Sequence, residues 1–217
     1  MVFSDRIEAA HRLVRVLAKY RGRHPLVVAI PRGAVPIGEI LARELSGDLD
    51  VVLVRKLRAP GNPEFAIGSV AESGWTYVAP YAEAAGGDPA YIEREKNYQL
   101  SVIRKRRERY TPLKPPIDPA GRIVIAVDDG LATGATMISA LHALRSQNPA
   151  WLVCAVPVAS EETLEKVRPY ADELICIEIP EFFHAVGQFY SNFPQVPDSE
   201  VEAILSRAGA DARPPTR

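Results

Sequence analysis

The stretch Ile123-Val-Ile-Ala-Val-Asp-Asp-Gly-Leu-Ala-Thr-Gly-Ala-Thr136 decides how this chain folds. Its first five residues are apolar and mostly β-branched, which is typical of a strand that is buried on both faces of a sheet. The strand ends at two adjacent carboxylates, Asp128 and Asp129. A short loop of small and hydroxyl residues follows, and an apolar helical pattern begins at residue 135. The stretch therefore predicts a strand, a loop and a helix, with the loop at the carboxyl end of the strand.

The loop at 130–134 has the composition of a phosphate-binding loop. Its backbone amides precede a helix, and the N-terminus of a helix favours anions. Thr133 and Thr136 add hydroxyl donors, and Gly134 lets the backbone approach a ligand closely. Two carboxylates beside a phosphate would repel it unless a sugar diol or a metal lay between them. Together these features indicate a sugar phosphate, and the alternative is an ordinary strand end with solvated aspartates and a threonine N-cap.

The composition is that of one globular domain. The chain has 217 residues, of which 47% are hydrophobic and 24% charged, which is sufficient for a single packed core. The formal net charge of −1 gives no general field that would attract nucleic acid. We find no apolar run long enough for a membrane span and no secretory signal, so we expect a cytoplasmic protein. The cysteines and histidines do not have the spacing of metal ligands.

Strand and helix patterns alternate along the chain. This alternation predicts an α/β fold, a Rossmann-like, mostly parallel sheet with helices on both faces, in one domain over 1–207. We expect 208–217 to be a disordered tail. In the first helix, Ile7 belongs to the apolar face that the spacing indicates. The other expected elements are strands at 26–30, 50–54, 123–127, 151–157 and 173–179, a hairpin at 65–78, and helices at 36–45, 88–110, 135–146, 161–169 and 198–205.

Two further loops follow predicted strands and carry cations. Arg32 and Gly33 come after the first strand, and Lys56 and Arg58 come after the second. Because ligands of such folds bind at the carboxyl ends of the strands, we expect both loops to lie near residues 128–134. The alternatives are a tight strand-to-helix turn for the first loop and a solvated basic loop for the second.

The stretch at 123–136 resembles the 5-phosphoribosyl-1-pyrophosphate (PRPP) motif of the type I phosphoribosyltransferases: a hydrophobic strand, two acids, three loose positions and Thr-Gly-x-Thr. The resemblance covers about 26–179 and implies that family's fold, with a β-hairpin lid at 57–75 and a C-terminal hood at about 180–197 that includes the helix at 4–20. It implies that Asp128 and Asp129 hold the ribose hydroxyls and, through ribose or water, Mg²⁺. The residues that it assigns to the 5′-phosphate loop are Gly130, Leu131, Ala132, Thr133, Gly134, Ala135 and Thr136.

The loop Pro31-Arg-Gly-Ala34 is similar to the pyrophosphate loop of the same family, which frequently contains a non-proline cis peptide bond. The resemblance implies that Arg32, Gly33, Lys56 and Arg58 bind the pyrophosphate.

Several positions resemble the adenine enzymes of the family. They are Arg55-Lys56, Pro60-Gly61 and Glu72, which lies in a Glu-x-Gly turn. In the adenine enzymes this glutamate transfers a proton, although an exposed hairpin-turn glutamate is an equal alternative here. Ala132 stands where enzymes for 6-oxopurines carry an aspartate, so the resemblance favours another purine.

Aromatic residues after the last strand resemble in position the hood that stacks on the base: Phe182, Phe183 and Tyr190. A small satellite core is the alternative. The basic run at 104–109 is interpreted as a solvated helix face.

The resemblance implies an enzyme, a pentosyltransferase that moves the phosphoribosyl group of PRPP to a nucleobase, with a purine favoured, and releases pyrophosphate. The expected partners are PRPP and a small-molecule acceptor, with Mg²⁺ as cofactor and neither nucleic acid nor membrane, and a homodimer stays open. Two alternatives are a non-catalytic PRPP or nucleotide regulator and a PRPP-dependent enzyme with a non-base acceptor.

Overall fold

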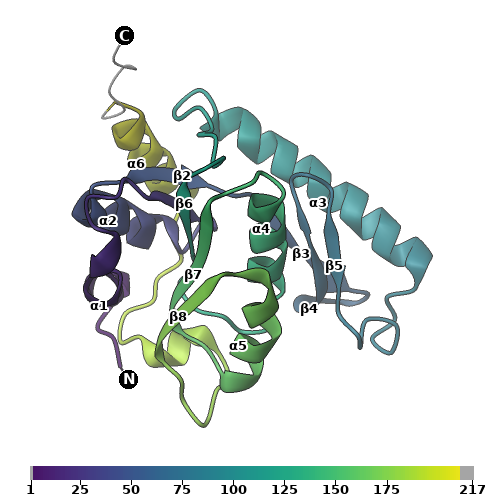
Figure 1. The fold of residues 1–217 in the computed structure, drawn as a ribbon. Helices are drawn as coiled ribbons and strands as arrows, with labels where there is room; N and C mark the ends of the chain where they lie inside the picture. Colours follow the sequence, from purple (N-terminus) through teal and green to yellow (C-terminus); the bar gives the residue numbers. More distant parts are fainter. Residues whose placement is uncertain (1, 211–217) are drawn as a thin grey trace.

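Five parallel strands form the central sheet of the computed structural model, which describes residues 2–210 (Figure 1). Their order is β2-β1-β6-β7-β8, so the direction of the crossovers reverses between β1 and β6. That reversal is the place where open α/β sheets bind their ligands. The strands are β1 (Leu26–Ala29), β2 (Asp48–Val51), β6 (Ile123–Val127), β7 (Trp151–Val158) and β8 (Glu173–Glu178).

Helices cover both faces of this sheet, which confirms the predicted α/β class (Figure 1). One core contains apolar side chains of α1 (Arg6–Val16), α2 (Val35–Leu45) and α6 (Asp198–Ala210). The other contains those of α4 (Ala135–Arg145) and α5 (Glu161–Val167). Within residues 2–210, no helix has the length and hydropathy that a membrane crossing requires.

Between β2 and β6 the chain leaves this sheet and builds a second, smaller one. The strands β3 (Val54–Ala59), β4 (Asn62–Ala71) and β5 (Thr76–Val78) pair antiparallel, and the long helix α3 (Pro89–Tyr110) follows. Helix α3 contacts β3 and β4, and α4 also contacts both of these strands. The second sheet therefore lies between two helices, at the side of the central sheet (Figure 1).

The segment at 57–75, which is expected to form a lid, contains more regular structure than predicted. The predicted hairpin is present, with Gly68 opposite Val78. However, the segment predicted as a basic loop after 50–54 is strand β3, and Leu57, Ile67 and Val70 are fully buried. These residues give the segment an apolar face that packs on α3 and α4. Its longest run of exposed residues is 60–63, which comprises the turn at 60–61 and the start of β4.

Asp50 joins the two ends of this excursion from the central sheet. Its buried carboxylate accepts hydrogen bonds from the backbone amides of Val51 and Ile117, each at 2.7 Å. The chain thus departs from β2 and returns toward β6 at the same point.

The two terminal helices differ in detail from the predictions. Asp5 caps α1, but Ile7 is 55% exposed and Arg6 is buried instead. Helix α6 continues to Ala210, so that 208–210 are helical rather than part of a tail, because Ala208 packs against the core. Residues 211–217 lie outside the described residues.

We predict that Asp50→Ala lowers the free energy of unfolding by about 2 kcal/mol, because two buried backbone amides lose their acceptor. Urea denaturation followed by circular dichroism measures this change. Asp50→Asn, which keeps one acceptor oxygen, should lose less. An unchanged urea midpoint in Asp50→Ala would show that the bonds from this carboxylate to residues 51 and 117 do not contribute to stability.

Candidate functional site

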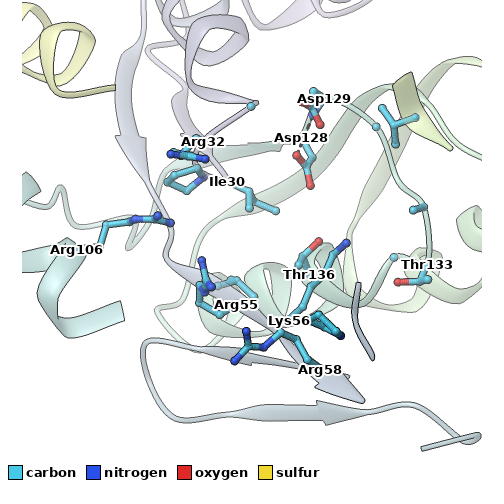
Figure 2. A pocket seen from close by; sticks show the side chains of 18 residues that line it. Ile30, Arg32, Arg55, Lys56, Arg58, Arg106, Asp128, Asp129, Thr133 and Thr136 are labelled. Carbon is cyan, nitrogen blue, oxygen red and sulfur yellow. Dashed lines mark hydrogen bonds between the residues drawn. The ribbon is translucent and has the colours of Figure 1, made fainter. Parts of the chain in front are cut away.

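A cavity of about 400 Å³ opens where β1 and β6 end (Figure 2). The loop after β1 forms one wall, β3 forms a second, and the loop after β6 forms a third. The structure brings together in this cavity residues that sequence analysis selected from three separate segments: Arg32, Gly33, Lys56, Arg58, Asp128, Asp129, Gly130, Ala132, Thr133, Gly134 and Thr136.

Asp128 directly follows β6, and its carboxylate faces the cavity (Figure 2). Its Oδ1 accepts a hydrogen bond from the amide of Asp129 at 2.9 Å. Loss of hydration and the neighbouring charge of Asp129 raise the pKa of Asp128, and the Lys56 ammonium opposes that rise. The ionised form of Asp128 is therefore energetically unfavourable at this position, which is typical of side chains that bind a ligand.

Asp129, in contrast, is bound by the protein itself. The Nε and Nη2 atoms of Arg6 donate to its Oδ2 at 3.0 and 2.8 Å. Arg6 also donates from Nη1 to the carbonyl of Pro194 at 2.7 Å, and its guanidinium lies 3.8 Å from the ring centre of Phe193. Burial raises the pKa of the Asp129 carboxyl, and the Arg6 charge counteracts this effect. Sequence analysis missed Arg6, because its partner lies 123 residues away.

The loop after β1 packs directly on this ion pair. A Cβ atom on Gly33 would lie 2.0 Å from Asp129 Oδ2 and 3.3 Å from Arg6 Nη2, so that only glycine fits. The Pro31–Arg32 peptide bond is cis, as the resemblance of this loop implied.

The loop after β6 turns into α4 at Gly134, whose φ of 77° favours glycine. Thr163 fixes the loop by donating to the carbonyl of Ala132 at 2.9 Å. Leu131 was expected in the phosphate loop, but it does not line the cavity. Its side chain is buried, and its amide donates to the carbonyl of Val158 at 2.9 Å. Ala135 also lies outside this cavity. The groups that face the cavity are Gly130, Ala132, Thr133, Gly134 and Thr136.

Basic side chains line the opposite side of the cavity. Arg55, Arg58 and Arg106 join Arg32 and Lys56 there (Figure 2). Arg106 comes from α3 and corrects the interpretation of 104–109 as only a solvated face.

The charges of these residues are only partly compensated. Arg32 and Arg106 share the carboxylate of Asp198, at 3.2 and 3.7 Å. Lys56 forms no ion pair with any residue in the part of the chain that the structure describes.

Glu72 is not at this site. Its two carboxylate oxygens accept hydrogen bonds from Arg107 of α3, and it does not line the cavity. The motif placed it in a turn between β4 and β5, but the turn faces α3 and its arginine.

Two of the three aromatic residues expected at the base also lie elsewhere. Phe182 is 73% exposed, and Tyr190 is buried with its hydroxyl donating to the carbonyl of Asp129 at 2.7 Å. Tyr190 therefore stabilises the backbone of the site at Asp129 and does not face the cavity. The third residue, Phe183, stacks on Phe189.

A second cavity, of about 480 Å³, adjoins the first. Ala132 and Thr133 line both cavities, so the loop after β6 forms part of the wall between them. The second cavity is partly aromatic, and its other lining residues include Tyr77, Tyr81, Phe183, His184, Thr163 and Lys166.

The chain is similar to several known proteins. A family model described as "Phosphoribosyl transferase domain" matches residues 5–194. In two strains of Mycobacterium tuberculosis, CDC 1551 / Oshkosh and ATCC 25618 / H37Rv, a protein named "Putative phosphoribosyl transferase" is 37% identical over 211 residues, which cover 97% of this chain and 48% of the relative. The chain thus spans about half the length of these curated relatives. The crystal structure of TT1426 from Thermus thermophilus is similar with a TM-score of 0.80 and 45% identity, covering 96% of this chain and 100% of that one.

The two aspartates should respond oppositely to removal of their charge. Asp129→Asn leaves Arg6 buried without its counter-ion, and we expect a loss of about 3 kcal/mol, or roughly 6–12 °C in Tm. Asp128→Asn relieves the repulsion between adjacent carboxylates and should raise Tm by roughly 2–4 °C at neutral pH.

Differential scanning calorimetry measures both changes. Because the folded-state pKa of Asp128 is raised, the gain in Asp128→Asn should shrink as the pH falls and the parent carboxyl takes up a proton. Equal losses of Tm in the two variants would contradict the different environments of the two carboxylates.

Proposed function

The chain belongs to the phosphoribosyl transferase family, and we propose that it transfers the 5-phosphoribosyl group of PRPP to a nucleobase and releases pyrophosphate. The observation that carries this proposal is the meeting of three groups in one cavity: the carboxylate of Asp128, the loop at 130–134 and the basic residues on the opposite side. A sugar that bears phosphates at both ends matches this order of charges.

In this proposal the loop after β6 binds the 5′-phosphate. Thr133 and Thr136 would donate from their hydroxyls, and the N-terminus of α4 would add its partial positive charge. Gly130 and Gly134 are needed for the shape of this loop, because a side chain on Gly130 would collide with Val158 and Val186, and Gly134 has a positive φ of 77°.

Asp128 would hold the ribose hydroxyls. Its negative charge would stabilise the positive charge that develops on the ribosyl ring when the bond to pyrophosphate breaks. Asp129 has one oxygen bound to Arg6, so that it contributes to the ribose with its other oxygen or only orients Asp128.

The basic residues would receive the pyrophosphate, with Arg32 and Lys56 in direct contact. The carboxylates suit Mg²⁺, which takes oxygen ligands and is commonly held by one or two carboxylates together with substrate phosphates and water. Among residues 2–210 there is no group of three or more His, Cys, Asp or Glu side chains that could hold a metal ion. When bound, the ion would neutralise part of the phosphate charge.

The second cavity is where we place the acceptor. It adjoins the loop at Ala132 and Thr133, and Phe183 offers an aromatic face for stacking. Ala132 has no carboxylate to bind a 6-oxopurine, so an adenine-like purine is the favoured base. Glu72 has no part in the reaction, because it is paired with Arg107 outside both cavities.

The proposal is tested by pyrophosphate release from PRPP and Mg²⁺ with adenine, guanine, hypoxanthine, uracil or orotate. Release should depend on a base, be greatest with adenine, and fall at least about 100-fold in Asp128→Asn. Glu72→Gln serves as a control of unchanged rate. PRPP binding without release in the presence of any base would favour a regulator, and release with amines alone would favour a non-base acceptor.

Phe183 and Phe182 form a matched pair for the acceptor cavity. Phe183→Ala should raise the KM for the base about tenfold, because it removes the stacking face, whereas Phe182→Ala should leave it unchanged, because that ring is exposed. Steady-state kinetics at saturating PRPP measures both. Equal KM values in the two variants would place the base elsewhere.

A further inference from the structure

Helix α3 buries two polar side chains where a helix normally buries apolar ones. Gln99 is fully buried and Glu95, one turn earlier, is 9% exposed. The amide of Gln99 donates to Oε1 of Glu95 at 2.7 Å. Burial of such groups is unfavourable unless their hydrogen bonds are satisfied, so their partners indicate their purpose.

The partners are two arginines of β3 that line the first cavity. Arg55 donates from Nε to the Gln99 carbonyl oxygen at 2.9 Å, and Arg58 donates from Nε to Glu95 Oε1 at 2.8 Å. The backbone amide of Arg58 also donates to the same carboxylate oxygen at 3.3 Å. Helix α3 therefore fixes both the side chain and the strand that carries it.

The same helix supplies a third arginine to the cavity. Arg106 lies two turns beyond Gln99 and reaches the cavity directly (Figure 2). The three guanidinium groups repel one another: burial and the charges of Arg106 and Arg58 lower the pKa of Arg55. The Glu95–Gln99 pair holds the two β3 arginines in place despite this repulsion, and it brings only one negative charge. The cationic character of this side of the cavity is retained.

We propose that Glu95 and Gln99 are positioning residues, which direct Arg55 and Arg58, together with Arg106, at the pyrophosphate of bound PRPP. The inference rests on the proposed function. It gives α3 the role of positioning the arginines that would bind the pyrophosphate. A pyrophosphate needs several cations, and guanidinium groups match the geometry of phosphate oxygens. Since the Gln99 bond uses only Nε of Arg55, the other donors of that guanidinium remain for the phosphate.

The test is isothermal titration calorimetry of the whole chain with inorganic pyrophosphate and Mg²⁺. Gln99→Met should raise the Kd about tenfold, the loss expected when one charge-assisted hydrogen bond is misdirected. Arg55→Met should raise it by at least as much. Because Gln99 acts through Arg55, the double variant should bind no more weakly than Arg55→Met alone. Asn97→Met is the matched control, since this amide lies on the same helix and bonds only to Glu93.

Several results would overturn the proposal. They are an unchanged Kd in Gln99→Met, additive losses in the double variant, or an equal loss in Asn97→Met. If Gln99→Met fails to fold, as judged by circular dichroism, Glu95→Gln with Arg58→Met gives the same cycle. A parent that releases pyrophosphate from PRPP but shows no such coupling would refute only the role of α3. A parent that neither binds nor releases pyrophosphate would refute the proposed function as well.

Discussion

The ion pair between Arg6 and Asp129 is the contact on which the rest of the site depends. It joins the first helix to the end of β6, and the same arginine holds the segment at 193–194. Gly33 packs against it from the loop after β1. Two buried charges are stable only together, since each would be strongly destabilising without the other. Four segments that are distant in sequence are therefore fixed around one carboxylate.

This pair also explains why two adjacent aspartates differ in chemistry. Burial raises the pKa of both carboxyls, but Arg6 pairs directly with Asp129, whereas Asp128 faces the cavity and forms no ion pair with any described residue. On the opposite side, the arginines are held by partners that neutralise their charges only in part, and Lys56 forms no ion pair within residues 2–210. The cavity thus has a negative side at Asp128 and a positive side at the basic residues. Both are maintained by side chains that do not face the ligand.

The sequence alone predicted the central sheet, because a buried parallel strand is recognised from its local apolar pattern. The loop after each such strand then lies at the carboxyl edge of the sheet. The loop at 130–134 was identified for the same reason. Arg6 was missed because the helical spacing selected the apolar Ile7. Burial of an arginine at position 6 is favourable only because Asp129, in the loop after β6, pairs with it. Arg106 was missed because a basic run does not show which of its members turns inward. Glu72 matched a motif, but the packing of α3 directs it to Arg107.

The closure of the excursion at Asp50 has a consequence for the evolution of this fold. Because the chain leaves and rejoins the central sheet at one point, the length of what lies between can change at little entropic cost to the core. That excursion carries β3 and α3, and with them three arginines of the cavity. Changes in length at the exposed turns of this segment, such as the one at 60–61, can thus reshape the anion-binding side, while its buried strands stay packed on α4 and the carboxylates and the loop after β6 stay as they are.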